Sequence, residues 1–351
     1  MDEHNLILTD IMKTGHHYFY GNYIRYASIK NQRIEIVNDY YRLPNNLSKY
    51  KRKIALICTI FTAYMDNPEF VADMNRRLDK LKSLGFKFII VSPWESRANV
   101  KSNTIIKTYQ LQCYTDWYGE HDWFWFYMYD RHLQKKDLFQ INHAEKKYDF
   151  LYLNKLPRSH RRRLFYKIKD TTDLLDNSLY SFIGEKTPIR LPREYEAPWV
   201  EGGIYQMENL NGQDQDIFEK PYNDSKYSLI TESNVNNNET FITEKIWKAI
   251  IMKHVFVVYG NYKTLEILRQ QGFRTFNDVF DEDYDNEPDA DVRMWKLVEL
   301  CKKLKSKDYK EIYNQTKEIR EHNFKNFFKR DNIVRNCSNT VKSWLALYDQ
   351  T

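Results

Sequence analysis

The chain has 351 residues, of which 42% are hydrophobic, and its formal net charge is +6. This length suits two domains of ordinary size, each with its own core. The mean hydropathy of −0.73 and the lack of a long apolar run argue against a membrane span. The excess of positive charge favours partners that carry phosphate or other anions. We expect a cytoplasmic protein, because the first residues lack the basic start of an export signal.

The sequence shows no motif for a metal or a cofactor. Its four cysteines are scattered and form no CxxC pair: Cys58, Cys113, Cys301 and Cys337. They are typical of reduced thiols rather than of a zinc site. No GxGxxG or GxxxxGK loop is present to hold phosphate. The Asp-x-Asp pairs of the acidic stretch Asp281–Asp285 do not lie at the end of a predicted strand, and we expect that stretch to be a solvated loop. We therefore expect neither an essential metal nor a cofactor.

The N-terminal part shows a β-α-β pattern. The apolar run Lys53–Phe61 predicts a buried strand, and the spacing of apolar residues over Phe70–Leu84 predicts a helix that Gly85 ends. The run Phe86–Val91 predicts the next strand, and such a unit implies a parallel sheet. Four more segments favour strands, the second of them only through a loose alternation: Asn5–Leu8, Tyr18–Val37, Thr104–Leu111 and Trp123–Tyr129.

A second series of alternating strands and helices follows the charged stretch His143–Lys147. The predicted strands are Tyr148–Leu153, Tyr227–Thr231, Val255–Tyr259 and Arg274–Phe276. The predicted helices begin near Arg158 and cover Thr243–Met252, Tyr262–Gln271 and most of Asp291–Leu347. The fold class is therefore α/β, with an N-terminal domain over residues 1–147 and a second domain over residues 148–332. The helix in residues 333–351 is expected to pack back on the first domain.

The most informative segment joins the strand Tyr227–Thr231 to the following helix. Glu232, Ser233 and Asn234 end the strand, and Thr243 stands where it can cap a helix that begins with Glu244 and Lys245. A helix N-terminus attracts anions through its free N–H groups, and Lys245 adds a charge for phosphate. Glu232 and Glu244 can accept hydrogen bonds from ribose hydroxyls. A capped amphipathic helix with solvated charges is the alternative interpretation of the same residues.

Residues Ser228 to Gly260 resemble the donor-binding motif of the α1,3-fucosyltransferases. The run Phe241–Trp247 is similar to the Tyr-Ile-Thr-Glu-Lys-Leu-Trp of that family, and Val255–Gly260 is similar to its next strand. Glycosyltransferases of bacteriophages and large viruses resemble the chain over more of its length. The resemblance implies the GT-B fold, in which two Rossmann-like domains face a cleft, with Glu244 on the ribose and Lys245 on the diphosphate of a nucleotide sugar.

Glu232 matches the strand-end Glu of the fucosyltransferase motif. The family's Asn falls on Ser233 here, and Asn234 comes one place later, so the sugar and the nucleotide stay open.

A basic segment, Tyr152–Arg163, predicts a second contact with the same ligand. Asn154 and Arg158 lie in a turn after a strand, and Arg162 falls one helical turn after Arg158. Guanidinium groups bind phosphate through paired hydrogen bonds, so Asn154, Arg158 and Arg162 are candidates for the diphosphate. A solvated basic patch or a patch that binds nucleic acid would have the same composition.

The catalytic base is expected at the carboxyl end of a strand in the N-terminal half, because ligands bind at that edge of a parallel sheet. This position selects Asp130, after the predicted strand Trp123–Tyr129, and then Asp66 and Glu95. His16 and His17 are further options.

Together these features predict a glycosyltransferase, inverting and independent of metal, that uses a nucleotide-diphosphate sugar. The acceptor is either a hydroxylated base in DNA or a glycan. The main alternative is a protein that binds nucleic acid through the arginines of Arg158–Arg163 without catalysis.

Overall fold

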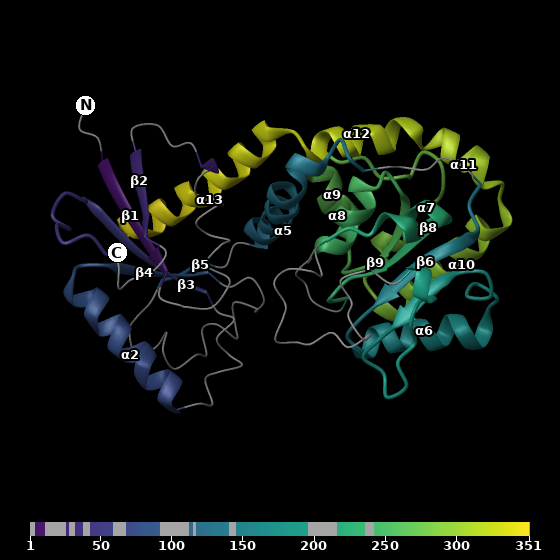
Figure 1. Ribbon diagram of the computed structural model, residues 1–351, viewed down its shortest axis with the longest axis horizontal. Coiled ribbons are helices and arrows are strands. Elements are labelled where there is room, and N and C mark those ends of the chain that lie inside the picture. The colour runs from purple at the N-terminus through teal and green to yellow at the C-terminus, as the bar shows by residue number, and fades with distance from the viewer. Residues whose placement is uncertain are drawn as a thin grey trace. The chain divides into compact units, whose positions relative to one another are not determined.

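The computed structural model describes residues 4–10, 26–27, 32–37, 43–58, 68–91, 112–114, 117–139, 145–195, 216–235 and 242–350. The protein is of the α/β class and contains two parallel sheets, each in its own compact unit (Figure 1). One unit is formed by Met1–Tyr127 together with Arg330–Thr351, and the other by Met128–Lys329. The division lies inside a helix, whereas the sequence placed it after residue 147.

The first unit contains a five-stranded sheet of order β2-β1-β3-β4-β5. Its strands are β1 (His4–Asp10), β2 (Gln32–Val37), β3 (Arg52–Cys58), β4 (Lys87–Val91) and β5 (Gln112–Tyr114). All neighbouring strands are parallel. Helix α2 (Pro68–Ser83) connects β3 to β4, as predicted, and Gly85 follows it at φ +80°, a conformation that favours glycine. Helix α13 (Arg330–Gln350) contacts β4 and β5.

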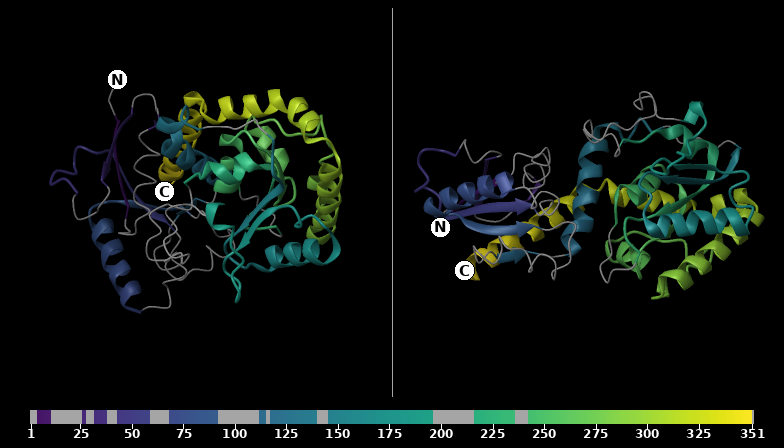
Figure 2. Two further views of the ribbon diagram at one scale, coloured as in Figure 1. Left: turned by 45° about the vertical axis from the view of Figure 1, so that its right-hand side comes forward. Right: turned by 90° about the horizontal axis from the view of Figure 1, so that it is seen from below.

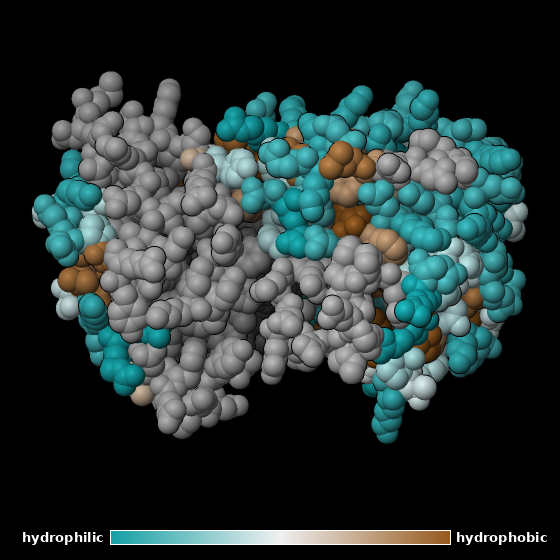
Figure 3. Space-filling view, viewed as in Figure 1, coloured by the Kyte–Doolittle hydropathy of each residue, from teal (hydrophilic) through white to brown (hydrophobic). Residues whose placement is uncertain are grey.

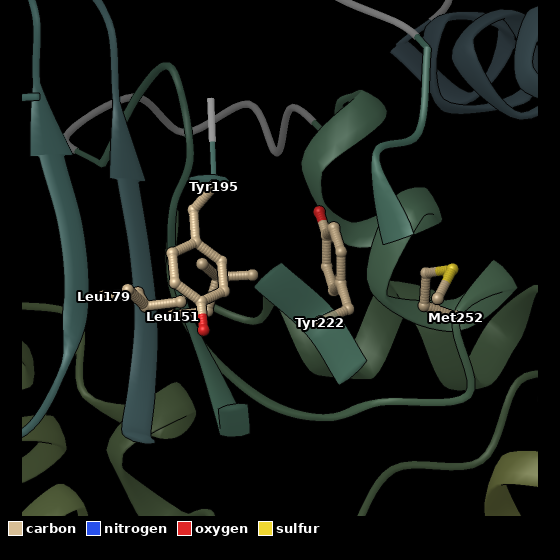
Figure 4. Packing of buried hydrophobic residues seen from close by; sticks show 5 residues of the cluster. All are labelled: Leu151, Leu179, Tyr195, Tyr222 and Met252. Carbon is tan, nitrogen blue, oxygen red and sulfur yellow. The ribbon is translucent and has the colours of Figure 1, made fainter. Parts of the chain in front are cut away.

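The second unit contains a four-stranded parallel sheet of order β7-β6-β8-β9. Its strands are β6 (Tyr148–Asn154), β7 (Leu179–Phe182), β8 (Ser225–Thr231) and β9 (Val255–Tyr259). Nearly every residue of β8 and β9 is buried, as expected of parallel strands that are covered on both faces. Figure 4 shows one part of this core, where Tyr195 and Tyr222 pack between the leucines of β6 and β7 and Met252.

Helices surround this sheet in the second unit (Figure 2). They are α6 (Ser159–Thr171), α7 (Glu219–Asp224), α8 (Glu244–Ile251), α9 (Thr264–Gln270), α10 (Ala290–Ser306), α11 (Tyr309–Gln315) and α12 (Lys317–Phe327). No helix among the described residues is long and apolar enough to cross a membrane. The described surface in Figure 3 is mostly hydrophilic, with brown patches of limited extent.

Two predictions about local structure are wrong. Trp123–Tyr129 belongs to helix α5 (Trp117–His132) and forms no strand. A continuous run of aromatic residues is typical of a buried strand and of a buried helix alike, so periodicity does not distinguish the two structures. Arg274–Phe276 is irregular, because side chains bind its backbone: Asn323 accepts from Arg274 N at 2.7 Å and Glu282 accepts from Phe276 N at 3.0 Å.

The acidic stretch Asp281–Asp285 is solvated only in part, since Asp281 and Asp283 are exposed but the other two acidic residues are not. Glu282 and Asp285 are buried, and Asp285 accepts hydrogen bonds from Leu265 N at 2.9 Å and Glu266 N at 3.3 Å. The carboxylate of Asp285 therefore caps the first turn of α9. The predicted strand Thr104–Leu111 lies outside the described residues.

Candidate functional site

The strand order of the second unit places a switch point between β6 and β8. The chain leaves β6 toward β7 on one side and returns to β8 on the other. In sheets of this kind, ligands bind outside the carboxyl ends of the strands where the order reverses. Asn154 ends β6 and Thr231 ends β8, and the Thr231 hydroxyl donates a hydrogen bond to Asn154 Oδ1 at 2.5 Å. The candidate site lies next to these two residues, at the carboxyl ends of β6 and β8.

Glu232 follows β8 directly and ties it to the start of α8. Its carboxylate is 0% exposed and accepts hydrogen bonds from Thr243 N at 3.0 Å and from Thr243 Oγ1 at 2.6 Å. Burial raises the pKa of Glu232, and Lys245 opposes this shift. Thr243 stands at the N-cap position but does not cap the helix with its hydroxyl, because that hydroxyl is bound to Glu232. Glu232 therefore positions the loop rather than offering a free carboxylate to a ribose.

Glu244 and Lys245 form the first turn of α8. Lys245 Nζ lies 2.8 Å from Thr243 Oγ1, 3.0 Å from Glu244 Oε1 and 3.8 Å from Glu232 Oε2. Its side chain is 24% exposed, so it is more enclosed than a solvated lysine. The pKa of Glu244 is lowered, mainly by Lys245 and Lys248 against the effect of burial. These charges are held at a helix end whose N–H groups attract anions.

The position of α8 is fixed by its buried face. Trp247 is fully buried, and its ring centroid lies 5.2 Å from that of Phe273 and 5.8 Å from that of Phe327. The helix has one apolar face toward the core, which consists of its buried residues Ile246, Trp247, Ala249, Ile250 and Ile251. The N-terminal turn of α8 is thereby anchored at the carboxyl end of β8.

Helix α6 brings three more polar groups to the same place. Arg158, at its N-cap position, donates to the Ser233 carbonyl. His160 Nε2 lies 3.0 Å from the Glu232 carbonyl oxygen, and Arg161 Nη2 lies 3.4 Å from the same atom. The backbone that leaves β8 is therefore surrounded by guanidinium and imidazole groups.

The cluster carries more positive than negative charge. Among the described residues, Arg158, Arg161 and Lys245 supply three cations to the cluster, and Glu232 and Glu244 supply two carboxyl groups. Desolvation lowers the pKa of both arginines, and the two carboxylates oppose this shift. A buried cation needs a compensating partner, so a bound anion would neutralise the excess positive charge of this cluster.

Two buried donors in the cluster lack a partner among the described residues. They are Asn154 Nδ2 and Arg161 Nε, on side chains that are each 3% exposed. Buried donors are nearly always satisfied in native proteins by protein, water or ligand. Both atoms favour a ligand or an ordered water that carries acceptor oxygens.

The other predicted site residues are distributed as follows. Arg162 is exposed and forms an ion pair with Glu185 at 2.6 Å, while its neighbour Arg161 faces the cluster. Asn234 is half-buried in the segment after β8. Asp130 lies in helix α5 and not at the end of a strand, so the predicted position of the base there is wrong. The remaining base candidates lie outside the described residues: Asp66, Glu95, His16 and His17.

The sequence missed three residues that shape the site: His160, Arg161 and Arg293. Buried Arg293, on α10, donates from Nε to the Gly260 carbonyl at 3.1 Å and from Nη2 to the Val235 carbonyl. It thereby joins the segments that follow β8 and β9. His160 and Arg161 belong to the basic run that the sequence shows, but the sequence alone does not show which side of helix α6 they occupy. The structure shows that both contact the Glu232 carbonyl. For Arg293 the sequence offers no local signal.

The described part of the chain contains no group of three or more His, Cys, Asp or Glu side chains that could hold a metal ion. No family model matches the chain, and no curated protein or solved structure is significantly similar to it.

Proposed function

We propose that the second unit binds the diphosphate of a nucleotide sugar at this cluster and that the protein is a glycosyltransferase. One observation carries the proposal: Arg158, Arg161 and Lys245 meet at the switch point of the sheet, beside the first turn of α8. In the part of the chain that the structure describes, two carboxyl groups offset these three cations. A diphosphate provides the missing negative charge and the acceptor oxygens for the unpaired donors.

The same groups suit the chemistry of sugar transfer. When the bond between the sugar and the diphosphate breaks, negative charge grows on the departing phosphate oxygens. Fixed cations and helix N–H groups stabilise that charge without rearrangement, and this is the largest contribution in many enzymes. In this proposal Lys245 and Arg158 hold the diphosphate, Glu244 accepts from the ribose, and Glu232 keeps Thr243 and the loop in position.

The GT-B arrangement belongs to this proposal as well. The second unit would bind the donor, and the first unit would supply the acceptor site and the base, for which Asp66 and Glu95 remain candidates. The acceptor would be a hydroxyl group of a modified DNA base or of a glycan. Transfer would be inverting, with the diphosphate stabilised by the protein's own cations.

A donor screen tests the proposal. The full chain is incubated with each common nucleotide sugar, and thermal unfolding is recorded; a bound donor raises the midpoint by mass action. Donors that stabilise the chain are then incubated with hydroxymethylated DNA and with glycans, and products are detected by mass spectrometry. Stabilisation by at least one nucleotide sugar and a sugar-sized mass increase on an acceptor are expected. A chain that no nucleotide sugar stabilises would refute the donor site.

The alternative of a nucleic-acid surface at Arg158–Arg163 fits the geometry less well. Arg158 and Arg161 turn inward to backbone carbonyls. Arg162 and Arg163 are exposed, and they pair with Glu185 and Asp291. A phosphate-binding surface needs several cations that are free to contact successive phosphates, and this run does not present them together.

A further inference from the structure

His160 is placed in the cluster in a single tautomer. Its Nε2 lies 3.0 Å from the carbonyl oxygen of Glu232, and a carbonyl oxygen only accepts hydrogen bonds. Nε2 therefore carries the proton, and in the neutral ring Nδ1 holds a lone pair. No hydrogen bond reaches Nδ1 from any residue that the structure describes. The ring thus has one fixed nitrogen and one nitrogen that can take up a proton.

The groups around His160 come from four elements. On its own helix α6, Arg158 and Arg161 are the nearest charges, and α8 contributes Lys245. The segment after β8 contributes the Glu232 carbonyl, and β9 contributes the ring of Tyr259, whose centroid is 6.3 Å away. In the free protein these surroundings disfavour an imidazolium: burial, and then the cations, lower the pKa of His160 to about 4.

A bound diphosphate changes this balance. It places at least two negative charges among the cations that now repel a proton from the ring. An opposite charge within hydrogen-bonding range raises a histidine pKa by about 1–3 units. An Nδ1–H group then becomes one more donor at the N-terminal turn of α6, a place where phosphate oxygens bind.

We infer that His160 takes up a proton at Nδ1 when a diphosphate binds and thereby becomes an additional cation that contacts the ligand. The inference rests on the proposed diphosphate site. The proton comes from solvent and returns to it when the diphosphate leaves, so the step needs no other reactant. His160 would thus make donor binding tighter at mildly acidic pH than at alkaline pH.

The test measures the pKa of His160 directly. The full chain is labelled with ¹³C at the histidine rings, and the ring resonances are followed by NMR between about pH 3 and pH 8, with and without saturating inorganic pyrophosphate. The variant His160→Gln identifies the resonance by its loss. We expect the pKa of His160 to rise from about 4 in the free protein by about 1–3 units in the complex.

His254 provides an internal control in the same spectra. It is also buried, with its pKa lowered to about 3, but Ser228 and the Ser225 carbonyl occupy its two ring nitrogens. Its ring should therefore stay neutral over most of this pH range, both with and without pyrophosphate.

Three outcomes separate the two claims. A rise at His160 with no change at His254 supports the inference. In a second outcome, calorimetry shows that pyrophosphate binds while the pKa of His160 changes by less than about half a unit, far below the expected shift. That result overturns the inference about His160 but not the diphosphate site. A chain that binds no pyrophosphate, and no nucleotide sugar in the donor screen, overturns both.

Discussion

Arg158 offers the sharpest test of the binding geometry. Its guanidinium has five N–H donors, and Nη1 binds the Ser233 carbonyl, so the remaining donors can meet phosphate oxygens. Arg158→Lys keeps the charge but removes the planar pair of donors. Loss of one hydrogen bond to a charged group costs about 1.5–3 kcal/mol, which corresponds to roughly 10- to 150-fold weaker binding. We expect this loss for a nucleoside diphosphate in a calorimetric titration.

Arg162→Lys is the matched control for this substitution. Arg162 lies on the same helix, but it is exposed and pairs with Glu185. An exposed ion pair contributes about 0–1 kcal/mol, and the pair is not part of the cluster. Binding of the nucleoside diphosphate should therefore change by less than about twofold. Equal losses in Arg158→Lys and Arg162→Lys, or no loss in either, would refute the assignment of Arg158 to the diphosphate.

Three further predictions follow from the contacts in the second unit. Lys245→Met should slow sugar transfer by about 100- to 1,000-fold, as loss of one fixed stabiliser does in other enzymes; steady-state rates with a saturating donor measure this, and an unchanged rate would contradict the role of Lys245. His254 has a pKa lowered from 6.5 to about 3, so below pH 6.5 the unfolded chain binds a proton that the native state does not, and native stability is lost as the pH falls. Between pH 8 and pH 5 this proton uptake lowers the free energy of unfolding by about 2 kcal/mol. In urea unfolding, the free energy of His254→Gln should therefore fall by about 2 kcal/mol less than that of the wild type over the same pH range. Equal losses in both proteins would contradict a buried neutral ring. Asp285→Asn should lower the free energy of unfolding by about 1 kcal/mol at pH 8, because one carboxylate oxygen caps α9. Burial raises the pKa of Asp285 to about 6, above its value in the unfolded chain, so the wild type gains stability as the pH falls from 8 to 5, whereas the Asn variant does not. The difference in urea unfolding should therefore grow by about 1 kcal/mol by pH 5, and an unchanged difference would contradict the raised pKa.

Much of the second unit could be predicted from the sequence, because its strands are short apolar runs bounded by polar residues. The range Val255–Tyr259 was predicted with the bounds that the structure gives it, and Glu244–Ile251 is a helix as expected. Both segments have a consistent local pattern: β-branched and aromatic residues before Gly260 in one, and one apolar face in the other. From the sequence, Lys245 and Arg158 are assigned to one ligand because both segments are typical of phosphate binding, and the structure brings the two residues to the same edge of the sheet.

What the sequence could not predict depends on contacts between distant residues. The aromatic run in Trp117–His132 is buried on several sides, so its periodicity does not distinguish helix from strand. Helix α9 begins after Lys263, which has φ +64° and gives no side-chain cap, and Asp285 supplies the cap from another loop. Arg293 likewise acts through carbonyls of segments far away in the chain. Hydrophobic and charge patterns carry no information about such partners.

The central claim is that a nucleotide-sugar diphosphate binds where β6 and β8 end. A crystal structure of the full chain with the nucleotide sugar selected by the donor screen tests this most directly. We predict that both phosphate groups lie within hydrogen-bonding distance of Arg158, Lys245 and the first turn of α8, with the ribose toward Glu244. Phosphates bound elsewhere on the chain, with the cluster around Glu232 in contact with solvent alone, would contradict the account.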